Sequence, residues 1–585
     1  MKTKYTAERN TLLLIALMKK HGLKKVIVSP GSTNSRFVAS IQSDPWFEIY
    51  SVVDERSAAY VACGMAAESG APVALSCTGA TASRNYVPAL TEAFYRQLPI
   101  LAITSTQHIG KVGNYIPQLI DRSAQMKDIV KLSVDCPSIH DSDDELATVV
   151  SLNKALLELE KDGGGPVHIN LATTYNTDFS VTELPDVRMI KRYTYGDSLP
   201  DIVGGKIGII VGSHVKWTDC LTQAVECFCE KYHAVVFVDH TSGYKGKYHA
   251  MVNLVTAQTG YRADCISLDL GIHIGNVSGS YHTLSMNNVW RVNIDGVVRD
   301  TYHHLTCVFQ MREEDFFAEY AKKSVHEEQI YPDLLEEWKR EEAELYERIP
   351  NDLPFSNPWV AKVTSEKIPE NASIHLGILS SLRSWNFFHT PNSVLGYSNV
   401  GGFGIDGGVS SMIGASMVRP DKLFFGSFGD LAFFYDLNSL GIRHIGKNLR
   451  IIIINNGKGT EFRNYNHPAN VIGEDTNTYI SAAGHYGNQS KLLVRHYAEA
   501  LGFEYMSAST KEEYMSHLDH FTVPELTEKS MIIEVFTDSE NESDALKIIN
   551  TLKQTATSSV KQIAKDMLGN EGVAAVRRMK KKFKL

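Results

Sequence analysis

The sequence predicts an α/β protein built from parallel sheets with helices on their faces. Short apolar, β-branched runs alternate with helix-like segments along most of the chain, which is the pattern of parallel strands joined by helices. The length of 585 residues suits about three or four domains of ~150 residues each. Two polar, Pro-containing passages, 173–199 and 350–358, indicate linkers. We therefore expect three domains, at 1–185, 186–350 and 351–585.

The first domain is expected to begin with a helix and continue as a series of strands and helices. The apolar segment Thr11–Met18 has charged neighbours and no small-residue cleavage site, so it predicts one face of an amphipathic helix and not a signal peptide. The expected strands are Lys25–Val28, Ile49–Val53, Pro72–Cys77, Pro99–Thr104 and a strand within Gly163–Leu171, after its glycine turn. The expected helices are Arg56–Ser69 and Ala82–Gln97.

The later domains repeat this alternation. The strands expected in the second domain are Lys206–Val211, Ala234–Asp239, Ala263–Leu270 and Val289–Ile294. A helix is expected near Thr218–Tyr232, and the charged stretch Glu336–Arg348 predicts a solvated helix. The strands expected in the third domain are Ser373–Leu376, Lys422–Ser427, Leu449–Ile454 and Met531–Thr537.

The composition argues against several classes of protein. A net charge of −9 disfavours a nucleic-acid-binding protein, and no run of about 18 apolar residues could span a membrane. Eight cysteines without a C-x-x-C pair predict neither a disulfide scaffold nor a zinc site, and they indicate a reducing, cytoplasmic compartment. The basic end, Val576–Leu585, predicts a frayed or docked helix, with contact to an anionic surface as the alternative. The expected partner is a small molecule.

The strongest local signal is a pair of polar residues that follow two expected strands. Asp430, in Gly429-Asp430-Leu431, follows the apolar run LFFGSF, and Asn456 follows the next strong strand. A helix expected over Phe433–Arg443 joins these strands, so their carboxyl ends should lie side by side, where α/β proteins bind ligands. A carboxylate, an amide oxygen and a nearby backbone carbonyl suit Mg²⁺, which also takes phosphate oxygens. The pair therefore predicts a Mg²⁺ site for a diphosphate ligand.

A second signal is the acidic start of an alanine-rich helix, Asp54-Glu55-Arg56-Ser57-Ala58-Ala59-Tyr60. Glu55 directly follows an expected strand. The helix dipole alone favours a glutamate in a first turn, so this segment indicates chemistry only together with the metal motif.

Taken together, these segments resemble the thiamine diphosphate (ThDP)-dependent decarboxylase superfamily and, within it, the SEPHCHC synthase family of the menaquinone pathway (2-succinyl-5-enolpyruvyl-6-hydroxy-3-cyclohexene-1-carboxylate synthase). The resembling segments are 29–32, 54–60, 72–90, 165–171, 398–407 and 429–440. The expected middle domain is similar only in its pattern. The resemblance implies a pyrimidine-binding domain, a middle domain and a diphosphate-binding domain, the first and last being related doubly wound units. It also implies a homodimer or homotetramer with active sites between subunits.

The resemblance implies roles for the residues that match the cofactor-binding motifs. Glu55 would hydrogen-bond N1′ of the aminopyrimidine and so help to deprotonate the thiazolium C2 carbon, which requires a desolvated carboxylate. Gln118 would face the cofactor and the reacting carbon, and Ile405 would hold the cofactor in its bent shape.

The resemblance also implies the metal ligands. Asp430, Asn456 and the carbonyl of Lys458 would bind Mg²⁺, although the family has a glycine in place of the lysine. Flanking cofactor-binding residues would be Gly429, Leu431, Glu461 and Phe462. The last two match apolar positions that line the thiazolium, so Glu461 departs from the family pattern.

The expected substrate site departs further from the family. The resemblance implies a pocket ringed by arginines, because both substrates of SEPHCHC synthase carry several carboxylates. The residues at the corresponding positions of this chain are Thr33, Gln107, Trp385 and Val400. Other residues expected at the site are Ser32, His108, Ser381 and Arg383, and further cations that could compensate are Arg36, Lys111 and Lys458. A shift of one or two residues in the match near 383–385 would let Arg383 take one of the four positions.

We therefore expect a ThDP- and Mg²⁺-dependent carboligase, a transferase or lyase that decarboxylates a 2-oxoacid and transfers the carbanion to an acceptor. The missing arginines favour a small donor such as pyruvate and a sugar or other polar acceptor. The alternatives are a true SEPHCHC synthase, a simple 2-oxoacid decarboxylase and a non-catalytic ThDP-binding protein. A nucleotide-binding oxidoreductase, suggested by IGIIVGSHV at 207–215, is disfavoured because the segment lacks G-x-G-x-x-G.

Overall fold

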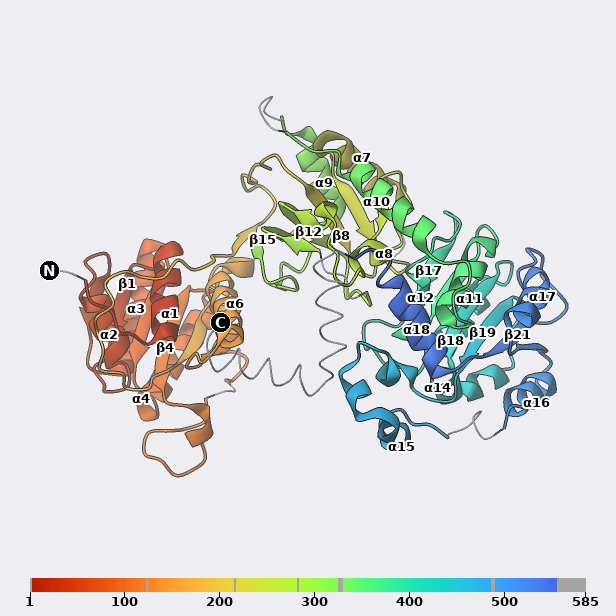
Figure 1. The fold of residues 1–585 in the computed structure, drawn as a ribbon. Coiled ribbons are helices and arrows are strands. Elements are labelled where there is room, and N and C mark those ends of the chain that lie inside the picture. The colour runs from red at the N-terminus through yellow and green to blue at the C-terminus, as the bar shows by residue number, and fades with distance from the viewer. Residues whose placement is uncertain are drawn as a thin grey trace. The chain divides into compact units, whose positions relative to one another are not determined.

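The computed structural model of the chain describes residues 3–122, 125–214, 217–280, 284–324, 330–484 and 490–554 (Figure 1). These residues belong to two compact units. One unit contains the chain up to Leu199 together with Asp295–Gln310, and the other contains Pro200–Ile294 and the chain from Met311 onward. The expected boundaries of three domains stay a prediction, and the basic segment Val576–Leu585 lies outside the described residues.

The first unit is built on a six-stranded parallel sheet with the strand order β2-β1-β3-β4-β6-β5. Its strands are β1 (Lys25–Val28), β2 (Glu48–Ser51), β3 (Val73–Cys77), β4 (Ile100–Thr106), β5 (Leu132–Cys136) and β6 (Val167–Ala172). Every residue of β3, β4 and β6 is buried, because helices cover both faces of the sheet (Figure 1). The helices are α1 (Arg9–Lys20), α2 (Ser35–Gln42), α3 (Glu55–Ser69), α4 (Thr81–Asn85), α5 (Val87–Tyr95) and α6 (Ser142–Glu158).

Three expectations for this unit are wrong. Helix α1 is buried along the whole of Asn10–Met18, so it is not amphipathic with a solvated face. The single helix expected at Ala82–Gln97 is two helices, because Pro88 in the first turn of α5 has no N–H to bond back into α4. The passage 173–199 is not a free linker, since it contains β7 (Lys191–Tyr193), which pairs in parallel with β15 (Leu305–Phe309).

The second unit contains five parallel strands in the order β10-β9-β8-β12-β14. They are β8 (Ile207–Val211), β9 (Val235–Val238), β10 (His249–Met251), β12 (Leu270–Ile274) and β14 (Val289–Val292). The strand expected at Ala263–Leu270 is misplaced, because that segment forms a 3₁₀ turn and the short β11 (Ser267–Leu268), which pairs with β13 (Ser285–Met286). The helices of this part are α7 (Asp219–Tyr232), α8 (Asn253–Thr256), α9 (Glu313–Lys322) and α10 (Leu334–Arg348).

The same unit also contains a six-stranded parallel sheet in the order β17-β16-β18-β19-β21-β20. Its strands are β16 (Ser373–Leu376), β17 (Leu395–Tyr397), β18 (Phe424–Gly429), β19 (Leu449–Asn455), β20 (Glu504–Ala508) and β21 (Met531–Phe536). Its helices are α11 (Asn357–Thr364), α12 (Ser380–Trp385), α13 (Gly408–Val418), α14 (Asp430–Tyr435), α15 (Thr476–Tyr479), α16 (Leu493–Ala500), α17 (Lys511–Phe521) and α18 (Ser539–Ile549). The helix expected at Phe433–Arg443 is replaced by the short α14 and a 3₁₀ segment, Leu437–Gly441.

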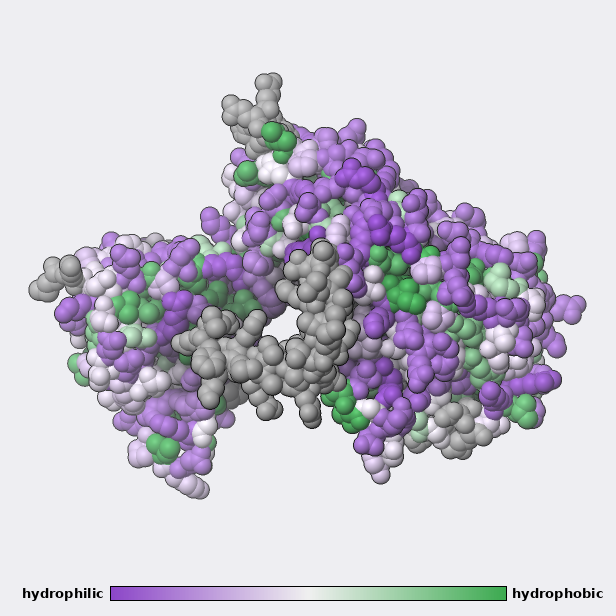
Figure 2. Space-filling view, in the orientation of Figure 1, coloured by the Kyte–Doolittle hydropathy of each residue, from purple (hydrophilic) through white to green (hydrophobic). Residues whose placement is uncertain are grey.

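The first and last sheets have the same strand order when their strands are numbered from one. The α/β class and the expected relationship between these two parts are therefore confirmed. Hydrophilic residues cover most of the face shown in Figure 2, with hydrophobic residues in small groups. Every helix of the described residues is too short or too polar to cross a membrane.

Helix α10 was expected to be solvated, but one of its faces belongs to the core. Leu334, Trp338 and Leu345 are each 0% exposed. The indole N–H of Trp338 donates to the Met251 carbonyl (3.2 Å), and its ring packs edge-on against Phe237. Glu342 also lies on the buried face, whereas the other charged residues of α10 are exposed or half-buried, so the expectation of a solvated helix holds for the opposite side alone.

Replacing Trp338 by alanine should destabilise the second unit by about 3–5 kcal/mol, the cost of emptying a large aromatic site in a core. Chemical denaturation would measure it. Lys339→Ala, an exposed neighbour on the same helix, is the control and should change stability by at most ~0.5 kcal/mol. Equal effects of the two substitutions would contradict the packing described for α10.

Candidate active site

The structure places the two residues of the predicted metal motif at the same edge of one sheet. Asp430 begins α14 directly after β18, and Asn456 directly follows β19. Strands β18 and β19 are parallel neighbours, with Gly429 paired to Ile454. The expectation that these strand ends lie side by side is therefore confirmed.

The Asp430 side chain is buried, with 4% of its surface exposed. Its Oδ1 accepts the N–H of Leu431 and its Oδ2 accepts the N–H of Gly457, both at 2.7 Å. Burial outweighs these hydrogen bonds and raises the pKa of the carboxyl group to about 7. A bound cation would stabilise the charged carboxylate and reverse this effect.

The side chain of Asn456 offers an oxygen beside this carboxylate. Its Oδ1 is buried and has no hydrogen-bond partner among the described residues. Near the Asn456 side chain lies Glu542, a buried carboxyl whose pKa is raised to about 7 by desolvation. A buried carboxylate beside an unpaired amide oxygen fits the hard-oxygen preference of Mg²⁺.

The third expected ligand is a backbone group. The carbonyl of Lys458 accepts the N–H of Thr460 (2.9 Å), and a carbonyl has a second lone pair. The lysine ammonium points elsewhere and donates to Oδ1 of Asn477 (3.2 Å). The described residues contain no group of three or more His, Cys, Asp or Glu side chains suited to a metal ion. A metal here would thus depend on amide and carbonyl oxygens as well as Asp430.

Glu461 and Phe462 lie in a 3₁₀ turn shortly after the metal motif. Both carboxylate oxygens of Glu461 accept N–H groups of Arg383, at 2.9 Å each. The Phe462 ring packs edge-on against His467, with ring centroids 5.3 Å apart. Ile405 is half-buried in the loop before α13.

The residues expected to act on the pyrimidine side lie in the first unit. Glu55 is the first residue of α3 and is half-buried, and Asp54 caps the helix by accepting the N–H of Ser57 (2.7 Å). Burial raises the pKa of both Cys77 and Tyr86, and the charge of Glu55 adds a smaller effect in the same direction. Gln118 is exposed and has a positive φ of 67°.

The expected substrate residues of the first unit differ in exposure. Ser32 and His108 are exposed, whereas Thr33 is buried and its hydroxyl has no hydrogen-bond partner among the described residues. The Gln107 amide bridges two residues, accepting from the Lys111 ammonium (2.6 Å) and donating to the Tyr175 hydroxyl (3.3 Å).

Arg36 is one of the cations that could compensate for a missing substrate arginine. Its guanidinium donates to the carbonyls of Tyr175 (2.9 Å) and Asn176 (3.1 Å) and lies over the Tyr175 ring. These contacts hold the loop after β6, which gives Arg36 a structural role in this unit.

The expected substrate residues of the second unit are mostly buried. Trp385 is 0% exposed, Ser381 2% and Val400 3%. Val400 fills the space beside Gly279, where an added Cβ would lie 2.6 Å from its Cγ1. Arg383 instead lines a cavity of about 760 Å³ together with Glu461 and Phe462. The roles of all these residues stay predictions.

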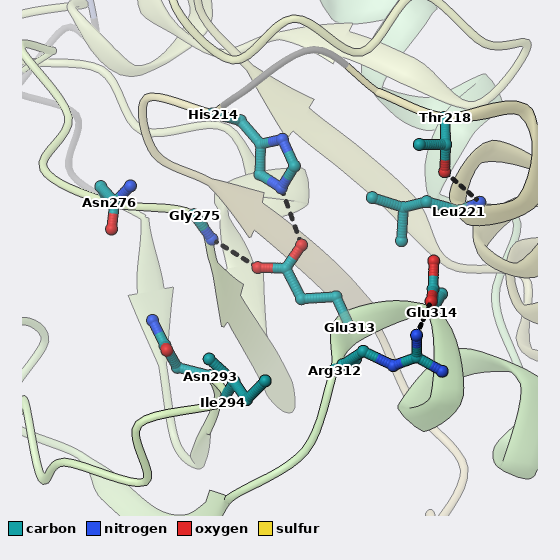
Figure 3. A pocket seen from close by; sticks show the side chains of 10 residues that line it. All are labelled: His214, Thr218, Leu221, Gly275, Asn276, Asn293, Ile294, Arg312, Glu313 and Glu314. Carbon is teal, nitrogen blue, oxygen red and sulfur yellow. Dashed lines mark hydrogen bonds and ion pairs between the residues drawn. The ribbon is translucent and has the colours of Figure 1, made fainter.

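A second cavity, of about 390 Å³, lies at the carboxyl ends of β8, β12 and β14 (Figure 3). Glu313, at the start of α9, hydrogen-bonds Nε2 of His214 (2.7 Å) and accepts the N–H of Gly275 (3.1 Å). These residues were not expected as a group from the sequence. The available signal was His214, soon after the expected strand Lys206–Val211, because parallel sheets bind ligands at the carboxyl ends of their strands.

Comparisons with known proteins agree with the cofactor motifs. The model of the N-terminal thiamine pyrophosphate-binding domain of thiamine pyrophosphate enzymes matches residues 11–126. A SEPHCHC synthase from Phocaeicola vulgatus is 30% identical over 571 residues, 93% of this chain and 98% of that protein. One from Bacteroides thetaiotaomicron is 29% identical over 570 residues, with the same coverage.

Among solved structures, the Rhodococcus jostii RHA1 thiamine diphosphate-dependent 4-hydroxybenzoylformate decarboxylase covers 90% of this chain and 99% of its own. Its sequence identity is 16% and its TM-score 0.37, values at which the superposition supports no assignment. The full-length similarity to SEPHCHC synthases does support one. This chain therefore belongs to the SEPHCHC synthase family of thiamine diphosphate-dependent enzymes.

Proposed function

We propose that this enzyme uses ThDP and Mg²⁺ to decarboxylate a 2-oxoacid and to transfer the resulting carbanion to an acceptor. The observation that carries the proposal is the unpaired, buried Oδ1 of Asn456 beside the buried carboxylate of Asp430. The residues at four of the family's arginine positions, Thr33, Gln107, Trp385 and Val400, favour an acceptor without carboxylates. Among specific reactions, SEPHCHC synthesis nevertheless has the best support from similarity, because the full-length relatives bear that name. It ranks above simple decarboxylation and above a non-catalytic role.

In this proposal, Asp430, Asn456 and the Lys458 carbonyl hold Mg²⁺ against the diphosphate. Bound ThDP supplies the electron sink for decarboxylation, and the protein supplies orientation and electrostatics. The two N–H donors from Leu431 and Gly457 fix the Asp430 carboxylate, so its oxygens are already positioned for a cation. Gly429 and Leu431 flank it on the strand end and the first turn of α14.

Glu55 is proposed to hold a proton opposite N1′ of the aminopyrimidine. Two features support this role: the side chain is half-buried, and Asp54 rather than Glu55 caps the helix. The Glu55 carboxylate is thus not needed for helix capping. Gln118 is proposed to face the reacting carbon and Ile405 to support the bent cofactor, as the family resemblance implies.

We also propose that the active enzyme is a homodimer or homotetramer with active sites between subunits, and that it works in the cytoplasm. Family resemblance supports the first statement. The eight cysteines, all of them free, support the second, because proteins of oxidising compartments usually form disulfides.

Replacing Asp430 by alanine should weaken Mg²⁺-dependent ThDP binding by about 100-fold or more, since losing even an outer-shell metal partner costs 10–100-fold. Calorimetric titration of ThDP in the presence of Mg²⁺ would measure this. Asp421→Ala, which removes an exposed aspartate before β18, is the control. Unchanged affinity in the Asp430 variant would rule out the metal assignment.

The variant Glu55→Gln keeps the size of the side chain but cannot share a proton. It should bind ThDP normally while exchange of the C2 proton slows by about 10²–10⁴-fold, the scale of lost general acid–base help. Proton exchange followed by NMR would test it. Glu68→Gln, on the exposed end of the same helix, should exchange at the wild-type rate. A normal rate in Glu55→Gln would leave this residue with a structural role.

Carboligation predicts that CO₂ release from a 2-oxoacid rises when an acceptor is added. The first assay pairs 2-oxoglutarate with isochorismate, the substrates that family resemblance implies, and later assays pair small 2-oxoacids with uncharged acceptors. A rate that no acceptor changes would indicate a simple decarboxylase. No release from any 2-oxoacid, with ThDP bound, would indicate a non-catalytic protein.

A further inference from the structure

The 760 Å³ cavity in the second unit has a wall that is almost free of net charge. It is formed by α8, the loop after β12, α12 and the segment that follows the metal motif. Among the described residues that line it, Arg383 and Glu461 are the ones with full charges, and they have opposite signs. The cavity is large enough for a substrate-sized molecule.

The two charged residues neutralise each other. The Arg383 guanidinium donates from Nη1 and Nη2 to the two Glu461 oxygens, at 2.9 Å each, and the Asn464 amide adds a third donor at 3.1 Å. The side chains are only 22% and 19% exposed, so solvent screens the pair weakly. Bidentate, charge-assisted bonds of this kind are among the strongest polar contacts in proteins.

The Arg383–Glu461 pair disfavours the binding of a carboxylate in the cavity. An incoming carboxylate could reach the bidentate face of Arg383 only by displacing Glu461, which would leave that acid partly buried and unpaired. Binding beside the intact pair would place two like charges close together. Either route makes the cavity unfavourable for a dicarboxylate.

The neutral groups of the wall are held in place by a hydrogen-bond network. The Ser280 hydroxyl donates to the buried Asp239 carboxylate (2.7 Å) and accepts from the Asn386 amide (2.9 Å). Oδ1 of Asn386 accepts the N–H of His240 (3.0 Å). Fixed hydroxyl and amide groups of this kind recognise other hydroxyl and amide groups with little loss of entropy.

Two further lining residues have side-chain oxygens that accept no hydrogen bond from the described residues. The amide oxygens of Asn253 and Asn550 are buried and have no partner among the described residues. A hydroxyl-bearing ligand brings donors to this part of the wall, whereas an ionised carboxylate only accepts hydrogen bonds. The charge and the hydrogen-bonding capacity of the wall therefore both favour an uncharged, hydroxyl-bearing ligand.

We propose that this cavity binds an uncharged, hydroxyl-bearing part of the acceptor, and that Glu461 determines this specificity by holding the Arg383 guanidinium away from carboxylates. The inference rests on the proposed carboligase function, because Glu461 and Phe462 match positions that face the cofactor in the family. Glu461 is thereby a specificity-determining residue of the reaction.

The test uses the full-length enzyme loaded with Mg²⁺ and ThDP, and succinate as the dicarboxylate probe. Calorimetry should detect weak or no binding to the wild type and about 10-fold or greater tightening in Glu461→Gln, which frees the guanidinium for a charge-assisted contact. The double variant Glu461→Gln/Arg383→Gln should lose this gain. Glu499→Gln, which breaks an exposed Arg–Glu pair on α16, should bind succinate like the wild type.

Succinate binding of equal strength in the wild type and Glu461→Gln would overturn the inference, as would a gain that survives in the double variant. Efficient SEPHCHC formation by the wild type, with kcat/KM near ~10⁴ M⁻¹s⁻¹ or above, would also overturn it while leaving the carboligase function intact. If no 2-oxoacid releases CO₂, the proposed function fails, but the succinate titrations still decide the role of Glu461.

Discussion

The parallel pairing of β18 with β19 is the constraint on which the proposed metal site depends. Asp430 follows the carboxyl end of β18 and Asn456 that of β19, and the register sets both ends at one edge. Backbone N–H groups fix the carboxylate, and the buried Glu542 lies near the Asn456 side chain. The unfavourable burial of polar groups is thereby concentrated where a cation and a diphosphate would offset it.

The repeated strand order gives the proposed metal site a counterpart in the first unit, at the residue expected to act on the pyrimidine of the cofactor. The first and last sheets have the same permutation, and each sends a helix with an acidic first residue from a strand end: Glu55 begins α3 after β2, and Asp430 begins α14 after β18. The strands differ, since β2 is at the sheet edge and β18 is central. A single architecture thus provides a half-buried carboxylate in one unit and a buried carboxylate in the other.

Cations expected near the substrate are already bonded to other groups of the protein. Arg36 is engaged by backbone carbonyls and Lys111 by the Gln107 side chain, while Arg383 is paired with Glu461. Three cations that could recognise a carboxylate are therefore bonded within the protein. Family membership rests on similarity over 93% of the chain, whereas the proposed preference for an uncharged acceptor rests on the environment of these residues.

The local sequence was enough to predict the α/β class, the strands β1 and β16 to the residue, and the adjacency of Asp430 and Asn456, because strand periodicity and strand-end residues are short-range patterns. It was not enough to predict that α1 is buried throughout or that α10 contributes a core face. Nor could it assign Glu461 to Arg383, 78 residues away along the chain. Burial and ion pairing depend on which distant segments meet, so only the tertiary structure decides them.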